Sequence, residues 1–359
     1  MKKIYYITAV FATLFLVGCG DGIDLPGVNV ETDLNKIPLP DNNVNLEQVE
    51  LKPSTEPMLH EGLHTEEDFQ RIRDKKAAGE EPWVSACQLL VESQFSQKTA
   101  DTYPTEWIKR GVSGDENYMN AARGATIAYQ QALRWKIEQD DEYAAKAVEN
   151  LNKWVQTCVG VTGNTNLSLA AGLYGYEFAI AGELLRDYEG WDRADFAAFQ
   201  NWLLKVFYPA NDDFLKRHHD TNALHYWANW CLCNIAAKMA IGIVTDRRDI
   251  YNEGIDHLQT GDTNGRLRRA IYHDYAPDYN FAQWQESGRD QGHTLMCVGL
   301  MGIICQLAWS QGDDFFAYDD NLFMRACEYA ACCNYTNETV PYTTYIWQKQ
   351  SQWGYPIPE

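Results

Sequence analysis

Apolar residues recur at three- and four-residue steps through much of the chain. In EYAAKAVENLNKWVQTCV (142–159) they form one continuous helical face, whereas Lys146, Glu149 and Lys153 fall on the opposite face. Segments 120–137 and 194–207 repeat this pattern. No proline interrupts residues 105–208 or 210–276, which favours long helices because proline breaks a helix interior. The pattern predicts a series of amphipathic helices.

Two further segments, 223–244 and 294–309, are apolar on almost every side. Such helices are buried all round, and neither has the uninterrupted length of a membrane span. Fully buried helices that alternate with amphipathic ones indicate a ring with an inner and an outer layer. We therefore predict an all-α fold, an α/α toroid, with a superhelical repeat array as the second choice although no fixed repeat period is visible. Strand-like alternation is scarce, with short extended segments expected near residues 340–347.

The first residues are typical of an export signal. Lys2 and Lys3 precede an apolar run at 4–17, and the run ends in LVGC at Cys19. LVGC resembles a bacterial lipobox, which predicts a lipoprotein signal peptide (1–19), lipidation of Cys19 and a lipid-anchored protein of the bacterial cell envelope. The alternative is an ordinary signal peptide. Residues 20–57 contain five of the twelve prolines and predict a flexible stalk, which leaves residues 58–359 for the folded domain.

The net charge of −20 argues against a nucleic-acid partner. It also repels other polyanions unless a local basic patch reverses the field. Six of the eight histidines and seven of the fifteen arginines lie within residues 217–293, so such a patch is expected there. Neither the nine cysteines after Cys19 nor the spacing Asp290-x-x-His293 matches a disulfide scaffold or a metal-ligand motif, and we predict no metal.

Several stretches of the chain together resemble one family. They are LHEGLHTEEDFQRIRDKKAAGEEPW, AYQQALRWKIEQDDEYAAKAVENLNKW, AGLYGYEFAIAGELLRDYEGW, HYWANWCLCNIAAKMAIGIVTDRR, QWQESGRDQGHT and AWSQGDDFFAYDD. They resemble the alginate-lyase-type polysaccharide lyases with an α/α toroid fold, and most closely polysaccharide lyase family 38. The resemblance extends over residues 60–345. It implies β-elimination on uronic-acid polymers, most of all alginate, and no metal or organic cofactor.

Two features depart from the family pattern. The chain ends at QWGYPIPE, where the resemblance predicts further helical sequence that would complete the ring. In the better-known alginate lyase branch an arginine precedes the tyrosine of a Tyr-His pair by seven positions, whereas here Arg266 precedes Tyr272 by six. The identity of the catalytic tyrosine therefore stays open.

Elimination on a uronate requires removal of the C5 proton and expulsion of the C4 oxygen. The site needs donors that neutralise the carboxylate, a base and an acid. HHDTNALHYW offers Asn222 and His225, and we expect His225 to act as the base or to orient the carboxylate together with Asn222. The alternative is a histidine that packs or caps the start of a buried helix.

RLRRAIYHDYAPDYN offers the tyrosines. Tyr279 and then Tyr272 are the candidates for proton transfer, with Arg266 as a substrate-binding residue. An ordinary tyrosine has a pKa of about 10, and we expect the neighbouring arginines to lower it. The alternative is that most of these side chains pack or solvate a loop.

QWQESGRDQGHT (283–294) places ionisable groups directly before an apolar helix. We expect Arg289 and His293 to hold a substrate carboxylate at the helix N-terminus, with Glu286 and Asp290 fixing them in place. The alternative is a structural salt-bridge cluster. Gln285, Trp227 and Asn164 complete the predicted substrate contacts. Further possible sugar contacts, most of which we expect in the core, are Asn166, Tyr174, Tyr176, Trp107 and Trp284.

Two other functions compete with a lyase. An α/α-barrel glycoside hydrolase needs two carboxylates on either side of the scissile bond, and Glu286 with Asp290 on one short loop is a poor arrangement for that. A surface glycan-binding lipoprotein would explain the lipobox and the aromatic residues. It would not explain the concentration of histidine, tyrosine and arginine in one region.

Overall fold

The computed structural model describes residues 54–335, 340–343 and 345. The helices are α3 (Glu66–Ala77), α4 (Trp83–Glu92), α5 (Tyr118–Glu138), α6 (Asp141–Thr157), α7 (Leu167–Leu184), α8 (Arg193–Val206), α9 (Tyr208–Arg217), α10 (Ala228–Val244), α11 (Arg248–Thr260), α12 (Leu267–Ala270), α13 (Gln291–Ser310) and α14 (Tyr318–Tyr335). The strands are β1 (Trp107–Arg110), β2 (Gly160–Gly163), β3 (Ile271–Asp274) and β4 (Ala282–Trp284), and the short 3₁₀ turns are η3 (Gln94–Ser96), η4 (His218–Asp220) and η5 (Gln285–Gly288).

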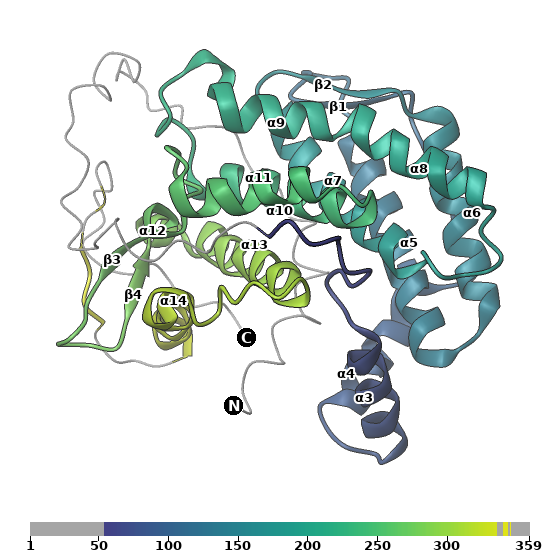
Figure 1. Ribbon diagram of the computed structural model, residues 1–359, viewed down its shortest axis with the longest axis horizontal. Coiled ribbons are helices and arrows are strands. Elements are labelled where there is room, and N and C mark those ends of the chain that lie inside the picture. The colour runs from purple at the N-terminus through teal and green to yellow at the C-terminus, as the bar shows by residue number, and fades with distance from the viewer. Residues whose placement is uncertain (1–53, 336–339, 344, 346–359) are drawn as a thin grey trace.

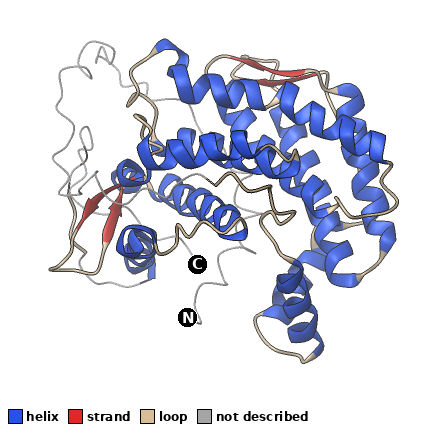
Figure 2. Ribbon diagram, viewed as in Figure 1, coloured by secondary structure: helices blue, strands red, loops and turns tan. Residues whose placement is uncertain are grey.

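The helices form two layers, as the hydrophobic pattern predicts. The inner helices α5, α7, α10 and α13 pack against one another in chain order, while α6 covers α5, α8 and α9 lie against α7, and α11 covers α10 (Figure 1). Every residue of α10 is buried, and α6 buries only its apolar face. Figure 2 shows how little of the fold is strand. The expected all-α toroid is therefore confirmed.

The inner helices approach closely because small residues lie between them. A Cβ atom added to Gly172 on α7 would stand 2.5 Å from the Cys233 sulfur on α10, so any larger residue would push the two helices apart. Between the inner helix α7 and the outer helix α8, the rings of Phe178 and Trp202 pack edge to face, with centroids 5.1 Å apart. Close packing of this kind fixes the relative positions of the helix ends.

The strands form two small sheets that the sequence pattern does not predict. β1 pairs with β2 in parallel, and β3 pairs with β4 in an antiparallel hairpin with an irregularity after Ile271. Each strand is three or four residues long, too short for a two-residue alternation to stand out. Of the segment predicted as extended, residues 340–343 and 345 carry no strand, and the remaining positions lie outside the described residues.

Helix α10 begins at Ala228, five residues later than its apolar pattern suggests. The Asn222 side-chain oxygen accepts a hydrogen bond from the Leu224 amide at 2.9 Å. This local bond offers the backbone a turn in place of a helix. His225 consequently lies on an irregular segment before the helix and not on the helix itself.

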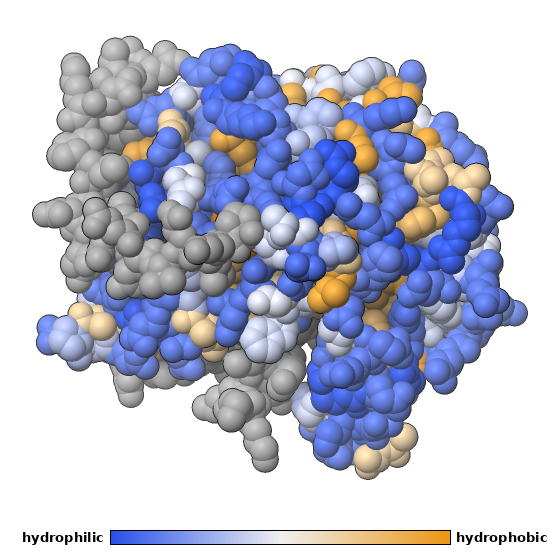
Figure 3. All heavy atoms as spheres, viewed as in Figure 1, coloured by the Kyte–Doolittle hydropathy of each residue, from blue (hydrophilic) through white to orange (hydrophobic). Residues whose placement is uncertain are grey.

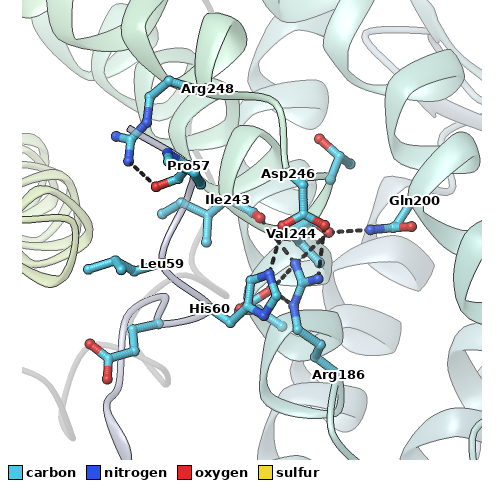
Figure 4. A network of polar contacts seen from close by, with 12 residues as sticks. Pro57, Leu59, His60, Arg186, Gln200, Ile243, Val244, Asp246 and Arg248 are labelled. Carbon is cyan, nitrogen blue, oxygen red and sulfur yellow. Dashed lines mark hydrogen bonds and ion pairs between the residues drawn. The ribbon is translucent and has the colours of Figure 1, made fainter. Parts of the chain in front are cut away.

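The inner helices run in the same direction, so the fold has two different ends. At one end, called here the site end, α7, α10 and α13 begin. At the other, residues 54–63 form a strap across the last turns of the same helices (Figure 4). The strap residue Leu59 exchanges backbone hydrogen bonds with the Gln311 side chain at 2.9 and 3.0 Å, just after α13 ends. His60 binds Asp246, just after α10 ends, at 2.9 Å.

The surface in Figure 3 is largely hydrophilic, with small scattered apolar patches. Among the described residues one helix, α13, is long and apolar enough to cross a membrane by composition, but 61% of that stretch is buried inside the protein, as expected of a core helix. The nine cysteines in the described part of the chain are all free thiols. Most of them are buried and pack as small apolar residues.

Candidate active site

The predicted residues of segments 222–229 and 283–294 meet at the site end. η5 bonds to the first turn of α10, and α10 packs along α13. The first contact between them is a pair of side-chain caps on α10. The Gln285 oxygen accepts from the Ala228 amide at 2.8 Å, and a Glu286 oxygen accepts from the Asn229 amide at 3.2 Å.

These two contacts explain why Gln285 and Glu286 stand before an apolar helix. The residue before α10, Trp227, supplies no side-chain cap, so the free amides of the first turn would be unsatisfied in a buried place. Both Gln285 and Glu286 are 0% exposed. The sequence predicts substrate contacts for both, whereas in the structure their oxygens bond to the first amides of α10. Their position is that of helix caps.

Glu286 also holds Arg289, as expected. Their ion pair measures 3.3 Å, and the Arg289 guanidinium lies over the Trp227 ring at 5.3 Å. Burial raises the pKa of Glu286, with the charge of Arg289 acting in the opposite direction. One side of the arginine is thus fixed by a carboxylate and an indole, while its side chain keeps partial exposure to solvent.

His293 lies in the first turn of α13, with its ring held by the N-cap residue Asp290. The Asp290 carboxylate accepts from the His293 amide at 2.8 Å and meets its Nδ1 atom at 2.5 Å. Burial opposes ionisation of Asp290, but the hydrogen bonds from His293 lower the pKa of this carboxyl overall. The predicted fixing of Arg289 and His293 by two acidic residues is therefore present, and so is the alternative salt-bridge cluster, since both describe the same contacts.

Three histidines surround Tyr226 at the start of α10. His225 meets the Tyr226 ring edge to face, with ring centroids 4.8 Å apart. His219 bonds to the Ser168 hydroxyl of α7 at 2.9 Å. His218 is 2% exposed, and burial lowers the pKa of its imidazole to about 4, so it is uncharged at neutral pH. Of the three, His225 and His219 are partly exposed.

The two candidate tyrosines lie in different surroundings. Tyr272 is 1% exposed, and its hydroxyl donates to the Thr343 carbonyl. Tyr279 is 51% exposed and contacts Tyr275 at the β3–β4 hairpin, with ring centroids 6.5 Å apart. Tyr272, unlike Tyr279, contacts Tyr345, and Tyr345 in turn contacts Trp227. The geometry thus favours Tyr272 over Tyr279, the reverse of the order that the sequence suggests.

The expected lowering of the tyrosine pKa by arginines is wrong for Tyr272. Burial raises the pKa of Tyr272 well above its ordinary value, and three neighbouring tyrosines add to the effect. Arg268 forms an ion pair with Asp319, and Arg269 donates to the Asp262 carbonyl. The predicted substrate-binding residue Arg266 is partly exposed beside them, at the N-cap position of α12.

Tyr345 is a site residue that the sequence does not reveal. Its ring lies 6.2 Å from Trp227 and 5.0 Å from Tyr272, and its hydroxyl hydrogen-bonds to Asn264 at 3.3 Å. Burial raises the pKa of Tyr345 above its ordinary value, and a hydrogen bond with Gln285 opposes this. The residue links the β3 segment to the α10 cap, from 60 positions after Gln285 in the chain.

Asn164 lies one residue before Thr165, which contacts the group of Tyr226 and the histidines. It is exposed at the end of β2, and its oxygen accepts from the Asn166 amide at 2.9 Å. The next residue, Thr165, hydrogen-bonds to Tyr226 and so connects β2 to the histidines. Of the possible sugar contacts, Trp284 is a core residue, 0% exposed and bonded to the Ala326 carbonyl at 3.0 Å, whereas Trp107 is 43% exposed.

A second missed group lies where α5 and α7 begin. Arg110 is only 4% exposed, with its guanidinium 4.7 Å from the Tyr118 ring and 3.5 Å from the Tyr174 hydroxyl. A lone arginine in a short strand gives no motif to find.

Cys19 lies outside the described residues, and the described part of the chain contains no group of three or more side chains suited to hold a metal ion.

Solved structures share the fold at low sequence identity. A histidine-to-alanine variant of alginate lyase A1-III, complexed with a tetrasaccharide, matches with a TM-score of 0.59 and 14% identity over 78% of this chain and 82% of that chain. Alginate lyase A1-III from Sphingomonas species A1 matches with a TM-score of 0.54 and 12% identity, covering 77% and 79%. An alginate lyase from Bacteroides ovatus matches with a TM-score of 0.51 and 14% identity, covering 75% and 82%.

No curated protein matches the chain by sequence. The sequence model of the family described as alginate lyase, however, matches residues 84–338. This span includes both layers of helices, the caps of α10 and the partly exposed residues Arg289, His293 and His225. The chain therefore belongs to the alginate lyase family and is a polysaccharide lyase.

Proposed function

We propose that the protein depolymerises alginate by β-elimination at the site end of the ring. The observation that supports this most is the position of Arg289, stacked on Trp227 and paired with Glu286 where α10 and α13 begin. It provides a fixed cation in a protein whose net charge is −20. A uronate carboxylate is the group that such a position recognises.

The helix ends add to the positive field. α7 begins at the site end without a side-chain cap, whereas Glu286 and Asp290 already cap α10 and α13. A helix N-terminus without such a cap has a partial positive charge. His293 lies in the first turn of α13. Neutralising the substrate carboxylate with these groups would make the neighbouring C5–H bond more acidic, because the carbanion-like transition state places negative charge on that carboxylate.

The proton transfers fall to His225 and a tyrosine. Imidazole is the side chain whose ordinary pKa lies nearest to neutrality, so His225 would take the C5 proton. The electron pair forms the C4–C5 double bond, the C4–O bond breaks, and a phenol protonates the departing oxygen. Tyr272 is the first candidate for this acid, since it contacts Tyr345 beside Trp227 and a phenol is protonated at neutral pH. Tyr279 is the second candidate.

The test is an assay of the purified protein on alginate, followed by the ultraviolet absorbance of the unsaturated uronate product. We expect that His225→Ala lowers kcat by about 10²–10⁴-fold, the usual contribution of a general base. Tyr272→Phe should act similarly and Tyr279→Phe should have little effect. Full activity in all three variants would refute these assignments even if the wild type forms unsaturated product.

The same assay separates the competing functions. A glycoside hydrolase would release reducing ends without unsaturated product, and a glycan-binding protein would release neither. A hydrolase is disfavoured by geometry, because Glu286 is committed to α10 and Asp290 to His293. Neither carboxylate is free to flank a glycosidic bond.

We also propose that Cys19 is lipidated and that the enzyme acts from the bacterial cell envelope. The support is the LVGC sequence after a short apolar run. Metabolic labelling with a radioactive fatty acid should mark the wild type but not Cys19→Ala. Labelling of that variant, or none in either protein, would contradict the anchor.

A further inference from the structure

His225 is a demanding residue to position, because its backbone belongs to no helix or strand. It follows a turn in which its own amide donates to the Asn222 carbonyl at 2.9 Å. A residue on such a segment has more backbone freedom than one inside a helix. A base that must meet a C5 proton nevertheless has to be held closely in place.

Asn264 lies against this segment and contacts the residues on both sides of His225. Its amide nitrogen donates to the Leu224 carbonyl at 3.0 Å and to the Tyr226 carbonyl at 2.8 Å. Asn264 is 2% exposed. Both amide hydrogens therefore go to the two carbonyls that flank His225, which fixes the direction of the backbone at the residue between them.

The loop that carries Asn264 is itself firmly seated. The neighbouring Thr263 hydroxyl bonds to His257 of α11 at 2.7 Å. On the other side, a Cβ atom at Gly265 would stand 2.5 Å from the Cys231 Cβ atom, so the loop lies directly on α10 with no room for a side chain. The Asn264 oxygen accepts from the Tyr345 hydroxyl at 3.3 Å. Asn264 thus joins three segments that are distant in sequence.

We propose that Asn264 is a positioning residue that clamps residues 224–226 and thereby holds His225 for proton transfer, without touching the substrate. The catalytic part of this inference rests on the proposed function. The clamp also predicts a property that does not depend on activity, namely slow exchange of the backbone amides of residues 222–229.

The sharpest variant is Asn264→Asp, which keeps the shape but removes both donors and sets carboxylate oxygens against two carbonyls. We expect kcat to fall by about 10–100-fold with KM changed less than about threefold, because a small misplacement of a catalytic group affects mainly the chemical step. Asn264→Leu, which adds no charge, should lower kcat in the same direction. Hydrogen exchange should quicken at residues 222–229 in both.

Asn150→Asp is the matched control. Asn150 is also fully buried, and its amide donates to Gln131 at 2.9 Å, but it lies on α6 away from the site. It should lose stability without the selective loss of kcat. Wild-type kcat in a folded Asn264 variant, or unchanged exchange at 222–229 in both variants, would overturn the clamp. If the wild type forms no unsaturated product while exchange quickens as expected, the clamp stands and the proposed reaction fails.

Discussion

The two ends of the ring are stabilised in different ways. At the site end, buried amides and carboxylates of η5 and Asn264 bond to backbone groups of the first turn of α10 and of the segment before it. At the strap end, Arg186 binds Asp246 at 3.1 Å and the Val244 carbonyl at 2.8 Å (Figure 4). It also binds Glu183 at 2.9 Å. The site end holds partly exposed side chains in place, whereas the strap end covers the last turns of the helices. Substitutions at the site end should therefore affect mainly activity, and substitutions at the strap end mainly stability.

The largest effect is expected at Arg186, which is 6% exposed. Arg186→Met should lower the free energy of unfolding by about 3–5 kcal/mol, because it leaves the buried Glu183 carboxylate without its cation. Urea denaturation measures this. The control is Arg247→Met, which removes an exposed ion pair with Asp249. It should lower the free energy of unfolding by less than about 1 kcal/mol. Below the unfolding temperature kcat should stay at the wild-type value, and a large fall in kcat would show that the two ends are coupled.

A smaller loss is expected at Gln311. Its side chain makes three hydrogen bonds to the strap backbone, to the Leu59 amide and to the carbonyls of Leu59 and Glu61. Gln311→Ala should cost about 1–3 kcal/mol, since it leaves backbone groups without partners. Thermal unfolding with the exposed Gln88→Ala as control tests this. A midpoint equal to that of the control would mean that water replaces these bonds freely.

The smallest expected effect is a pH dependence within the inner layer. Burial raises the pKa of Glu177 on α7 to about 8, with a hydrogen bond from Thr126 acting against it. Because the folded state holds this proton more tightly than the unfolded state, its contribution to stability is complete below the ordinary pKa and is lost as the pH rises through 8.

The unfolding midpoint of the wild type should accordingly fall between pH 6 and about pH 9 by more than that of Glu177→Gln. Glu149→Gln on the solvent side of α6 is the control, because hydrogen bonds from Lys153 and Lys146 lower the pKa of that residue. Its alkaline slope should equal that of the wild type. A Glu177→Gln slope as steep as the wild type would place the titrating group elsewhere.

The helical layers were predictable because a buried helix face requires apolar residues at regular positions over many residues. The all-round apolar character of 294–309 and the single apolar face of 142–159 translate directly into α13 and α6. Pairings between neighbours in sequence, such as Glu286 with Arg289, could also be foreseen, because they need only helical or turn spacing.

The rest of the site depends on contacts between distant positions. Tyr345 reaches Trp227 from more than a hundred residues away, and Asn264 meets Tyr226 from the far side of α11. The pKa of Tyr272 was expected to fall because arginines are its neighbours in sequence. In space its neighbours are tyrosines and the Thr343 carbonyl, and burial raises the pKa instead.

The strap also fixes the point at which the described chain enters the fold. Its first described residue, Ser54, accepts a hydrogen bond from Asn252 in the first turns of α11, at the end of the ring opposite to His225. The described chain therefore enters the fold on the side away from Arg289 and His293. A polymer bound at those two residues would lie on the face opposite this entry point, so the strap and the substrate would not compete for the same surface.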